Sequence, residues 1–417
     1  MSHVKIPEIP LSKVWEIYQV MKNRLAKDVF GRDSDWRDND WRERLYSQGG
    51  GEGLGTLQMI LTAILSGGHV LLEDYPGSGK SFLASKLSEC LKDDLVEGEE
   101  RTEIKKYKRI QCVPDLLPSD ILGFNKPAQQ GSKPQFIPGP IFAHFLLLDE
   151  INRTTPKVQS AMLEAMAEER VTVEGEPHEL GPLFFVIATQ NPLDKTGTYP
   201  LPGASLDRFL FKRTLSPISR EACVRIMLES GSDGKKRFQE WCDKKNIKSP
   251  AENAEKVYAD REVLGTELVG SKNAIKTKVT LSNATVDALV KVDEIIAESY
   301  DKPFADTGIR FEEGSRPSPR TLKRLAGALK VMALIREGER IEKEVLGTDK
   351  KMDEKKHQEI GSKLDSCGLE TTPALIKPIV ADFLRHRVYP KAGGTVSGKD
   401  IELCLVAIAE EAIKRTL

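Results

Sequence analysis

The stretch that decides the fold of this chain is HVLLEDYPGSGKS, residues 69–81. Its first part is a short apolar run typical of a buried strand, and SFLASKLSECLK, residues 81–92, has the apolar spacing of a helix. Between them, PGSGKS matches the end of the phosphate-loop pattern G-x-x-x-x-G-K-[ST]. Asp74 stands where that pattern has its first glycine, at a turn position that aspartate tolerates well. The stretch therefore predicts a strand, a phosphate-binding loop and a helix in succession.

This loop predicts a nucleotide site. In such loops, consecutive backbone N–H groups at the start of a helix bind phosphate oxygens, and glycines permit the tight curvature. Lys80 is expected to place its charge at the β- and γ-phosphates, and Ser81 to offer a hydroxyl to Mg²⁺. We expect the nucleotide contacts to come from six consecutive residues: Gly77, Ser78, Gly79, Lys80, Ser81 and Phe82.

Four further segments have the character of buried strands. They are YKRIQCV (107–113), HFLLLDE (144–150), LFFVIATQN (183–191) and FLFKRTL (209–215). Apolar runs of this length, separated by helical segments, indicate strands buried on both faces. The sequence thus predicts an α/β domain built on a parallel sheet.

Polar residues at the ends of these strands predict the chemistry of the site. Asp149 is expected to hold the Mg²⁺ shell, and Glu150 to polarise the attacking water as a general base. Asn191 ends the next strand, where its neutral amide can position that water. Arg208 precedes the last strand, at an edge suited to donation into a neighbouring subunit's site as an arginine finger.

Composition limits the class of protein. The chain has 417 residues, 30% of them charged and 39% hydrophobic, with a net charge of −1, as in an ordinary globular protein that is not expected to bind nucleic acid. Its apolar runs are far shorter than the roughly 20 residues of a membrane helix, so no membrane insertion is expected, and the N-terminus has no signal-peptide core. Six dispersed cysteines, none at CxxC spacing, are expected to be structural in a reducing cytoplasm.

The chain divides into three parts. Residues 1–50 form an N-terminal helical arm that carries three of the four tryptophans, with docking on the main body or binding of a partner as its two interpretations. Residues 51–217 contain the strands and the phosphate loop. In residues 218–417 helical patterns dominate, and two polar stretches, 231–256 and 347–363, are interpreted as solvated insertions.

The motifs PGSGKS, LLLDEINR, ATQNP, YPLPGASLDRF and SPR occur in the order of the MoxR family of AAA+ ATPases, which the chain resembles from residue 53 to about 415. This resemblance implies an AAA+ P-loop three-layer α/β sandwich with a five-stranded parallel sheet, followed by an all-α lid. It implies ATP and Mg²⁺ near the subunit interfaces of a ring, most often a hexamer. Lys80 and Ser81 match the Walker A motif, Asp149 and Glu150 match Walker B, and Asn191 matches sensor 1. Arg208 matches the arginine finger, and Arg320 matches sensor 2 on the lid.

The family implies a chaperone-like role: remodelling, assembly or activation of a client protein complex, often with a partner that contains a von Willebrand factor A domain. Its clade carries a helix 2 insert, here expected as a pore-facing hairpin near residues 121–139. Gly203 and Ser205 depart from the family pattern, which has glutamate and glutamine there. A nucleic-acid translocase, a metal-chelatase motor subunit and a non-hydrolysing scaffold are the alternatives.

Overall fold

The architecture was analysed in a computed structural model. It describes residues 6–28, 55–73, 80–92, 105–127, 134–191, 197–215, 224, 227–228, 233–245, 261, 263–300, 303–304, 307, 309–312, 318–347, 352–384, 387 and 398–417. Trp36 and Trp41 of the N-terminal arm, Asp74 and the loop residues Gly77, Ser78 and Gly79 lie outside these ranges.

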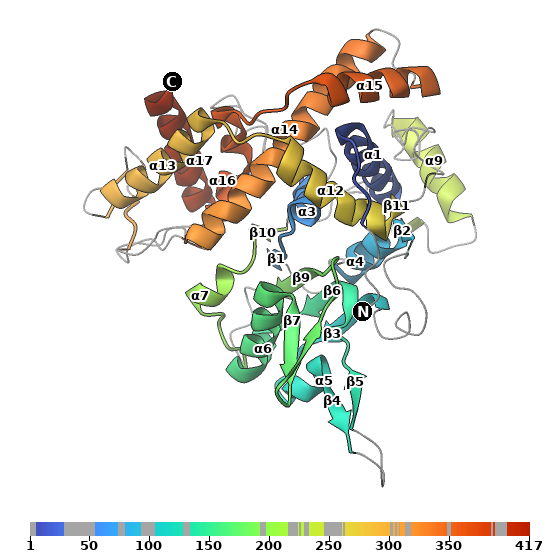
Figure 1. Ribbon diagram of the computed structural model, residues 1–417, viewed down its shortest axis with the longest axis vertical. Helices are drawn as coiled ribbons and strands as arrows, with labels where there is room; N and C mark the ends of the chain where they lie inside the picture. Colours follow the sequence, from blue (N-terminus) through green and yellow to red (C-terminus); the bar gives the residue numbers. More distant parts are fainter. Residues whose placement is uncertain are drawn as a thin grey trace.

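A five-stranded parallel sheet forms the centre of the molecule (Figure 1). Its strand order is β10-β1-β9-β6-β3, and the register pairs Glu73 with both Gln190 and Thr214. These strands are formed by the five segments that the sequence predicted: β1 (Val70–Glu73), β3 (Lys105–Gln111), β6 (Ala143–Asp149), β9 (Phe185–Gln190) and β10 (Phe211–Thr214).

Helices cover both faces of the sheet because successive side chains of each buried strand point to opposite sides. Leu72 packs with α1 (Leu11–Asp28), α3 (Thr56–Ser66) and α4 (Lys80–Glu89) on one face. Leu71 and Leu148 pack with α5 (Pro118–Leu122) and α6 (Pro156–Glu168) on the other. The resulting layers confirm the predicted α/β fold.

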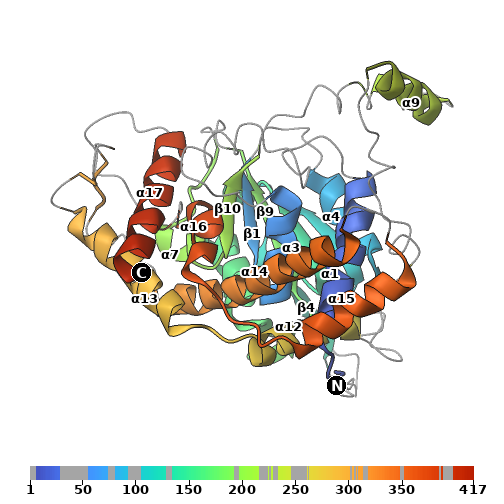
Figure 2. The ribbon, with the colours of Figure 1, turned by 90° about the horizontal axis from the view of Figure 1, so that it is seen from above.

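The C-terminal part is helical and lies across one face of the sheet (Figures 1 and 2). We call it the lid. None of the helices in the described ranges is long and apolar enough to span a membrane. The helices are α9 (Gly234–Lys245), α12 (Gly265–Lys278), α13 (Asn283–Glu298), α14 (Pro319–Leu346), α15 (Glu354–Ser366), α16 (Lys377–Leu384) and α17 (Gly398–Thr416), with the short turn η4 (Pro373–Leu375).

A buried ion pair joins the lid to the sheet. The guanidinium of Arg213, on β10, pairs with the Asp382 carboxylate on α16, and its Nε donates to Asp382 Oδ1 at 2.9 Å. The Arg213 side chain is fully buried. Because breaking a buried pair leaves an unpaired charge, this contact fixes α16 against the sheet.

The structure adds a packed helix to one of the two polar stretches of the lid. The polar stretch 347–363 does not form a solvated insertion throughout, because α15 occupies most of it and packs on α1 and α14. Ile360 and Leu364, one helical turn apart, are fully buried. The two apolar side chains among many lysines and glutamates suffice to anchor a helix whose other faces are solvated. By contrast, the described side chains of α9, in the other polar stretch, are mostly exposed, and Figure 2 shows this helix apart from the other helices.

The N-terminal helix α1 is part of the core. Trp15 is 1% exposed and stacks on Tyr18, with ring centroids 5.5 Å apart. Gly338 of α14 leaves room for the indole, since a Cβ there would lie 2.4 Å from Trp15 Cε3. In this part of the arm the tryptophan therefore packs on the main body instead of facing a partner.

Two antiparallel hairpins project from the α/β domain, below the sheet in Figure 1. The first, β4 (Gly123–Lys126) with β5 (Gln135–Pro138), lies within the predicted insert 121–139. The second, β7 (Arg170–Val173) with β8 (Glu176–Glu179), was not predicted, although alternating VTV before Glu-Gly is a hairpin pattern. Glu174 and Gly175 both have positive φ, of 51° and 89°, in its turn. Two-residue strands β2 (Leu91–Lys92) and β11 (Val263–Leu264) pair separately.

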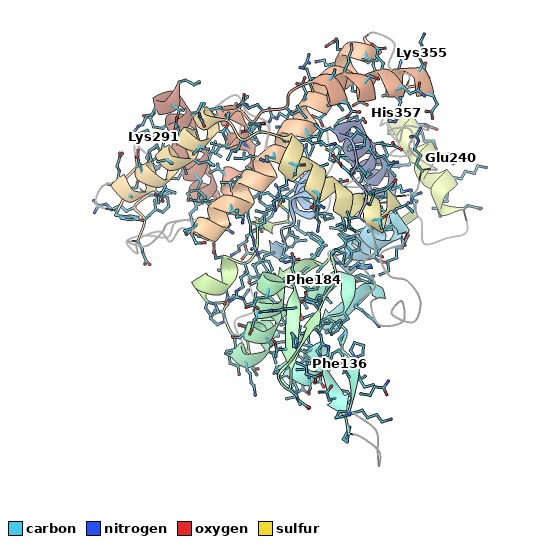
Figure 3. The ribbon with its side chains drawn as sticks, viewed as in Figure 1. Phe136, Phe184, Glu240, Lys291, Lys355 and His357 are labelled. Carbon is cyan, nitrogen blue, oxygen red and sulfur yellow. The ribbon has the colours of Figure 1, made fainter. Side chains whose placement is uncertain are left out.

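His69 is buried where β1 begins and connects three elements. Its Nδ1 accepts a hydrogen bond from the Val186 backbone N at 3.1 Å, so Nε2 carries the proton and donates to Met166 O at 3.1 Å. The ring packs edge-on against Phe184, which Figure 3 marks. Burial first, and then the positive charge of Arg324, lower the pKa of His69 to about 3. The ring is therefore neutral at physiological pH.

The neutral His69 predicts acid sensitivity. Its folded-state pKa lies below its unfolded value, so the stabilisation is complete above pH 6.5 and is lost as the pH falls towards 3. Between pH 7 and pH 5 we expect this group to remove about 2 kcal/mol from the free energy of unfolding. Urea unfolding at both pH values should show this difference in the wild type and a smaller one in His69→Gln. Equal pH dependence in the two proteins would contradict the assignment.

Candidate nucleotide site

Three of the predicted phosphate-binding residues, Lys80, Ser81 and Phe82, are described, and they follow β1 at the carboxyl edge of the sheet. Helix α4 begins at Lys80, directly after the loop that follows β1, and its first turn contains Ser81 and Phe82. Gly77, Ser78 and Gly79 belong to that loop, outside the described residues. The strand before the loop and the helix after it are the context that a phosphate loop requires.

Asp149 ends β6, which β9 separates from β1, and Glu150 follows it; Thr189 of β9 connects the two. The Thr189 hydroxyl donates to Asp149 Oδ1 at 2.7 Å and accepts from the Glu150 backbone N at 2.9 Å. Glu150 has a φ of 60°, a left-handed conformation that costs a non-glycine residue about 1 kcal/mol. The hydrogen bond from its N–H to Thr189 holds the backbone of Glu150 in this turn.

Strand β3 supplies a partner for each of the two carboxylates. Arg109 Nη2 lies 2.7 Å from Asp149 Oδ2, and Gln111 Nε2 donates to Glu150 Oε2 at 3.2 Å. Arg109 also donates to Gln111 Oε1 at 2.5 Å, which links the two pairs. The guanidinium therefore bonds the carboxylate that the sequence assigns to Mg²⁺. Sequence reasoning missed Thr189, Arg109 and Gln111, because strand pairing alone brings them beside Asp149 and Glu150.

Asp149 and Glu150 act as negative charges at this edge of the sheet, where Arg109 pairs with Asp149 and Arg153 Nε lies 3.2 Å from Glu150 Oε2. Burial, and then the negative charges of Asp149 and Glu150, raise the pKa of the nearby Cys112 thiol to about 12. A thiol with this pKa stays protonated and is a poor nucleophile. The thiol thus senses both carboxylates as negative charges, and carboxylate oxygens are the ligands that Mg²⁺ prefers. The residues present fit a magnesium nucleotide.

Asn191 follows β9 at the same edge, and its neighbour Gln190 is tied to the strand that precedes the phosphate loop. Gln190 Nε2 donates to Glu73 Oε1 at 2.6 Å, and Lys212 Nζ pairs with the same oxygen at 2.9 Å. Thr214 donates to the other carboxylate oxygen at 3.0 Å. The buried Glu73 therefore holds together the ends of β1, β9 and β10, next to Asn191 and the loop.

Arg208 lies at the opposite edge of the sheet. It precedes β10, where Leu210 N donates to the His69 carbonyl at 2.7 Å, at the start of β1. Its half-buried side chain donates from Nη1 to Leu163 O of α6 at 2.5 Å. The strands thus bring Lys80, Asp149, Glu150 and Asn191 to one edge and place Arg208 at the other.

Arg320 is the second residue of α14, and the start of this helix lies near the short helix α7 (Gly203–Leu206), which precedes Asp207 and Arg208 (Figures 1 and 2). The Ser318 hydroxyl donates to the Asp207 carboxylate at 2.7 Å, and Arg324 Nη1 donates to the Arg208 carbonyl at 2.5 Å. The sequence positions assigned to the arginine finger and to sensor 2 are therefore neighbours in space, although more than 100 positions separate Arg208 from Arg320 in the chain.

Comparison with known proteins agrees with the fold. Residues 69–211 match the family described as "ATPase family associated with various cellular activities (AAA)". A crystal structure of a protein from Cytophaga hutchinsonii has the same fold, with a TM-score of 0.60, 23% identity, and coverage of 97% of this chain and 96% of that one.

The amino-acid sequence is also similar to those of curated proteins. YeaC of Bacillus subtilis is 50% identical over 152 residues, which are 36% of this chain and 44% of YeaC. The protein named Chaperone MoxR1 of Mycobacterium tuberculosis is 31% identical over 280 residues, 67% of this chain and 64% of that protein. The alignments thus span less than two thirds of the relatives' own lengths. The matched fold, the order of its motifs and these relatives show that the chain belongs to the MoxR family of AAA+ ATPases.

Proposed function

We propose that this protein is a MoxR-type ATPase that hydrolyses ATP with Mg²⁺ in an oligomeric ring and uses the energy to remodel, assemble or activate a client protein complex. One observation carries the proposal. Lys80, Asp149, Glu150 and Asn191 meet at one edge of the sheet, whereas Arg208 is held at the other edge by Leu163. A site built this way is complete only when a second subunit brings its Arg208.

Each residue at the carboxyl edge has a proposed role. Gly77–Phe82 bind the phosphates with backbone N–H groups, and Lys80 adds its charge. Ser81 and Asp149 hold Mg²⁺, which when bound neutralises charge on the β- and γ-phosphates. Glu150 accepts the proton of the attacking water, and Asn191 orients that water. Thr189 supports this chemistry because it fixes Asp149 and the backbone of Glu150 relative to each other.

The position of Arg320 supports a role in the neighbouring site. The bond from Ser318 to Asp207 places the start of α14 next to Arg208 and on the side away from Lys80. We therefore assign Arg320, like Arg208, to the nucleotide of an adjacent subunit. A ring, proposed as a hexamer, lets each subunit both bind ATP and complete the site of the next one.

The two hairpins are the proposed contact with the client. Phe124, on β4, is 50% exposed, an unusual exposure for a phenylalanine. The hairpins are tied together, since Asn125 donates to Glu174 at 3.0 Å and Phe136 stacks on His178 with ring centroids 3.7 Å apart (Figure 3). An aromatic side chain on a braced hairpin suits a protein client. A partner with a von Willebrand factor A domain remains part of the proposal.

The basic stretch 101–109 does not favour nucleic acid as the client. Arg109, its last residue, pairs with Asp149 inside the nucleotide site. No other described feature favours a translocase over a chaperone-like ATPase.

Hydrolysis and assembly can be tested together. We expect purified protein to release phosphate from ATP, to lose this activity in EDTA, and to regain it with excess Mg²⁺. Mass photometry with ATP should show a species several times the 46.4 kDa mass of one chain. A protein that hydrolyses ATP as a monomer would contradict the proposed ring.

A further inference from the structure

The carboxylate of Asp207 links the lid to the segment that carries Arg208. Asp207 follows the short helix α7 (Gly203–Leu206). Its Oδ1 accepts a hydrogen bond from Arg387 Nε at 2.9 Å, and its Oδ2 accepts one from the Ser318 hydroxyl at 2.7 Å. Both donors belong to the lid: Ser318 directly precedes α14, and Arg387 follows α16.

Arg387 binds this segment with its whole guanidinium. Its side chain is 3% exposed and also donates to the backbone carbonyls of Asp207 at 3.3 Å, Phe209 at 2.5 Å and Leu210 at 3.3 Å. A further bond goes to the carbonyl of Phe383, over whose ring the guanidinium lies. A planar fork with several donors fixes the backbone it binds, which a lysine cannot do.

Arg208 lies inside this set of contacts. The carbonyls on either side of it are bonded to Arg387, and its own carbonyl accepts from Arg324 of α14. The lid therefore holds the backbone of Arg208 from two directions. A shift of α14 or of the end of α16 has to move Arg208 or break bonds to a buried cation, and breaking such bonds is costly.

We propose that Asp207 and Arg387, together with Ser318, are positioning residues that set the place of Arg208 according to the position of the lid. The inference rests on the proposed function, in which Arg208 completes the neighbouring site. It adds that the lid of one subunit controls hydrolysis in the next through this contact. Arg320, two residues after Ser318, moves with the same contact.

Asp207→Asn tests the inference directly. A misplaced catalytic group can lose about 10²-fold in rate, and we expect kcat to fall by about this factor. Affinity for a fluorescent ATP analogue should change less than about twofold, because the phosphate-binding residues lie at the other edge. Asp365→Asn is the matched control: Asp365 of α15 accepts bonds from the Ser12 backbone N at 2.9 Å and from the Ser12 hydroxyl at 2.6 Å, outside the contacts to the Arg208 segment, and we expect kcat per folded protein to be retained.

Ser318→Ala is a milder variant that leaves the Arg387–Asp207 pair intact, and it carries the test if Asp207→Asn does not fold. We expect a lower kcat with unchanged affinity for the analogue, and recovery in Ser318→Thr, which keeps the hydroxyl. Wild-type kcat in Ser318→Ala and Asp207→Asn would overturn the inference.

Mixed assemblies separate this inference from the proposed function. Asp207→Asn subunits mixed with Glu150→Gln subunits should regain part of the activity, since each supplies what the other lacks. Recovery with Arg208→Ala subunits but not with Asp207→Asn subunits would overturn the positioning role and leave the proposed function standing. A wild-type rate for Arg208→Ala alone would overturn the finger role and, with it, the inference.

Discussion

Replacing Glu150 with glutamine is expected to lower kcat for ATP hydrolysis by about 10²–10⁴-fold, the usual contribution of a general base. Glutamine keeps the size of the side chain and an oxygen for the bond from Gln111, but it accepts no proton from water at neutral pH. Affinity for ATP should remain, because the phosphate loop is unchanged. Phosphate release under saturating ATP measures the effect.

Glu164→Gln is the control for this variant. Glu164 is an exposed glutamate on α6, and the same change there should leave both kcat and the affinity for ATP unaltered. If Glu150→Gln hydrolysed ATP as fast as the wild type, Glu150 would not be the base. The slow variant also offers a route to the client, since a pull-down in the presence of ATP should retain complexes that wild-type turnover releases.

Arg208→Ala is expected to reduce kcat by about 10³–10⁵-fold, the range for removal of an arginine finger. The variant removes a positive charge that, in the proposed ring, only an adjacent subunit can supply to the nucleotide. Within one chain, Arg208 and Lys80 lie at opposite edges of the sheet. The variant also loses the bond to Leu163 O, so its thermal stability is measured in parallel. ATP binding by the variant's own subunit should persist.

Mixing experiments show whether this arginine acts between subunits. Inactive Arg208→Ala and Glu150→Gln subunits should regain part of the wild-type rate together, because some interfaces then pair an intact base with an intact arginine. Arg415→Ala, which removes an exposed pair with Glu298, serves as the control and should keep the wild-type rate. Absence of recovery at every mixing ratio would contradict action in trans.

The sequence predicted much of the fold because the local signals in the α/β domain agree with one another. The apolar runs ending in Glu73, Asp149 and Gln190 became strands of one parallel sheet, and Lys80 begins a helix. The helical lid was also predicted, but α12 and the buried face of α15 were not. The apolar residues of these two helices are interspersed with charged and polar ones. The burial of a pair such as Ile360 and Leu364 cannot be predicted until the helix that packs on it is known.

The N-terminal arm shows the same limit. Its amphipathic pattern predicted a helix but left two interpretations, docking or partner binding. The choice depended on Gly338, more than 300 positions away, which makes space for Trp15. No local pattern connects the two.

By itself the sequence predicted the chemistry proposed for this protein: the phosphate loop, the acidic pair Asp149 and Glu150, Asn191 and the two arginines are contiguous motifs with characteristic neighbours. Only the tertiary structure decided which of the described residues lie together. Parallel strand pairing places Thr189, Arg109 and Gln111 around the two carboxylates, and the lid brings Ser318 and Arg387 onto Asp207. A motif consists of neighbouring residues and can therefore be recognised in the sequence. The separation of Arg208 from Lys80 follows from strand direction and domain packing, and these depend on contacts between distant residues.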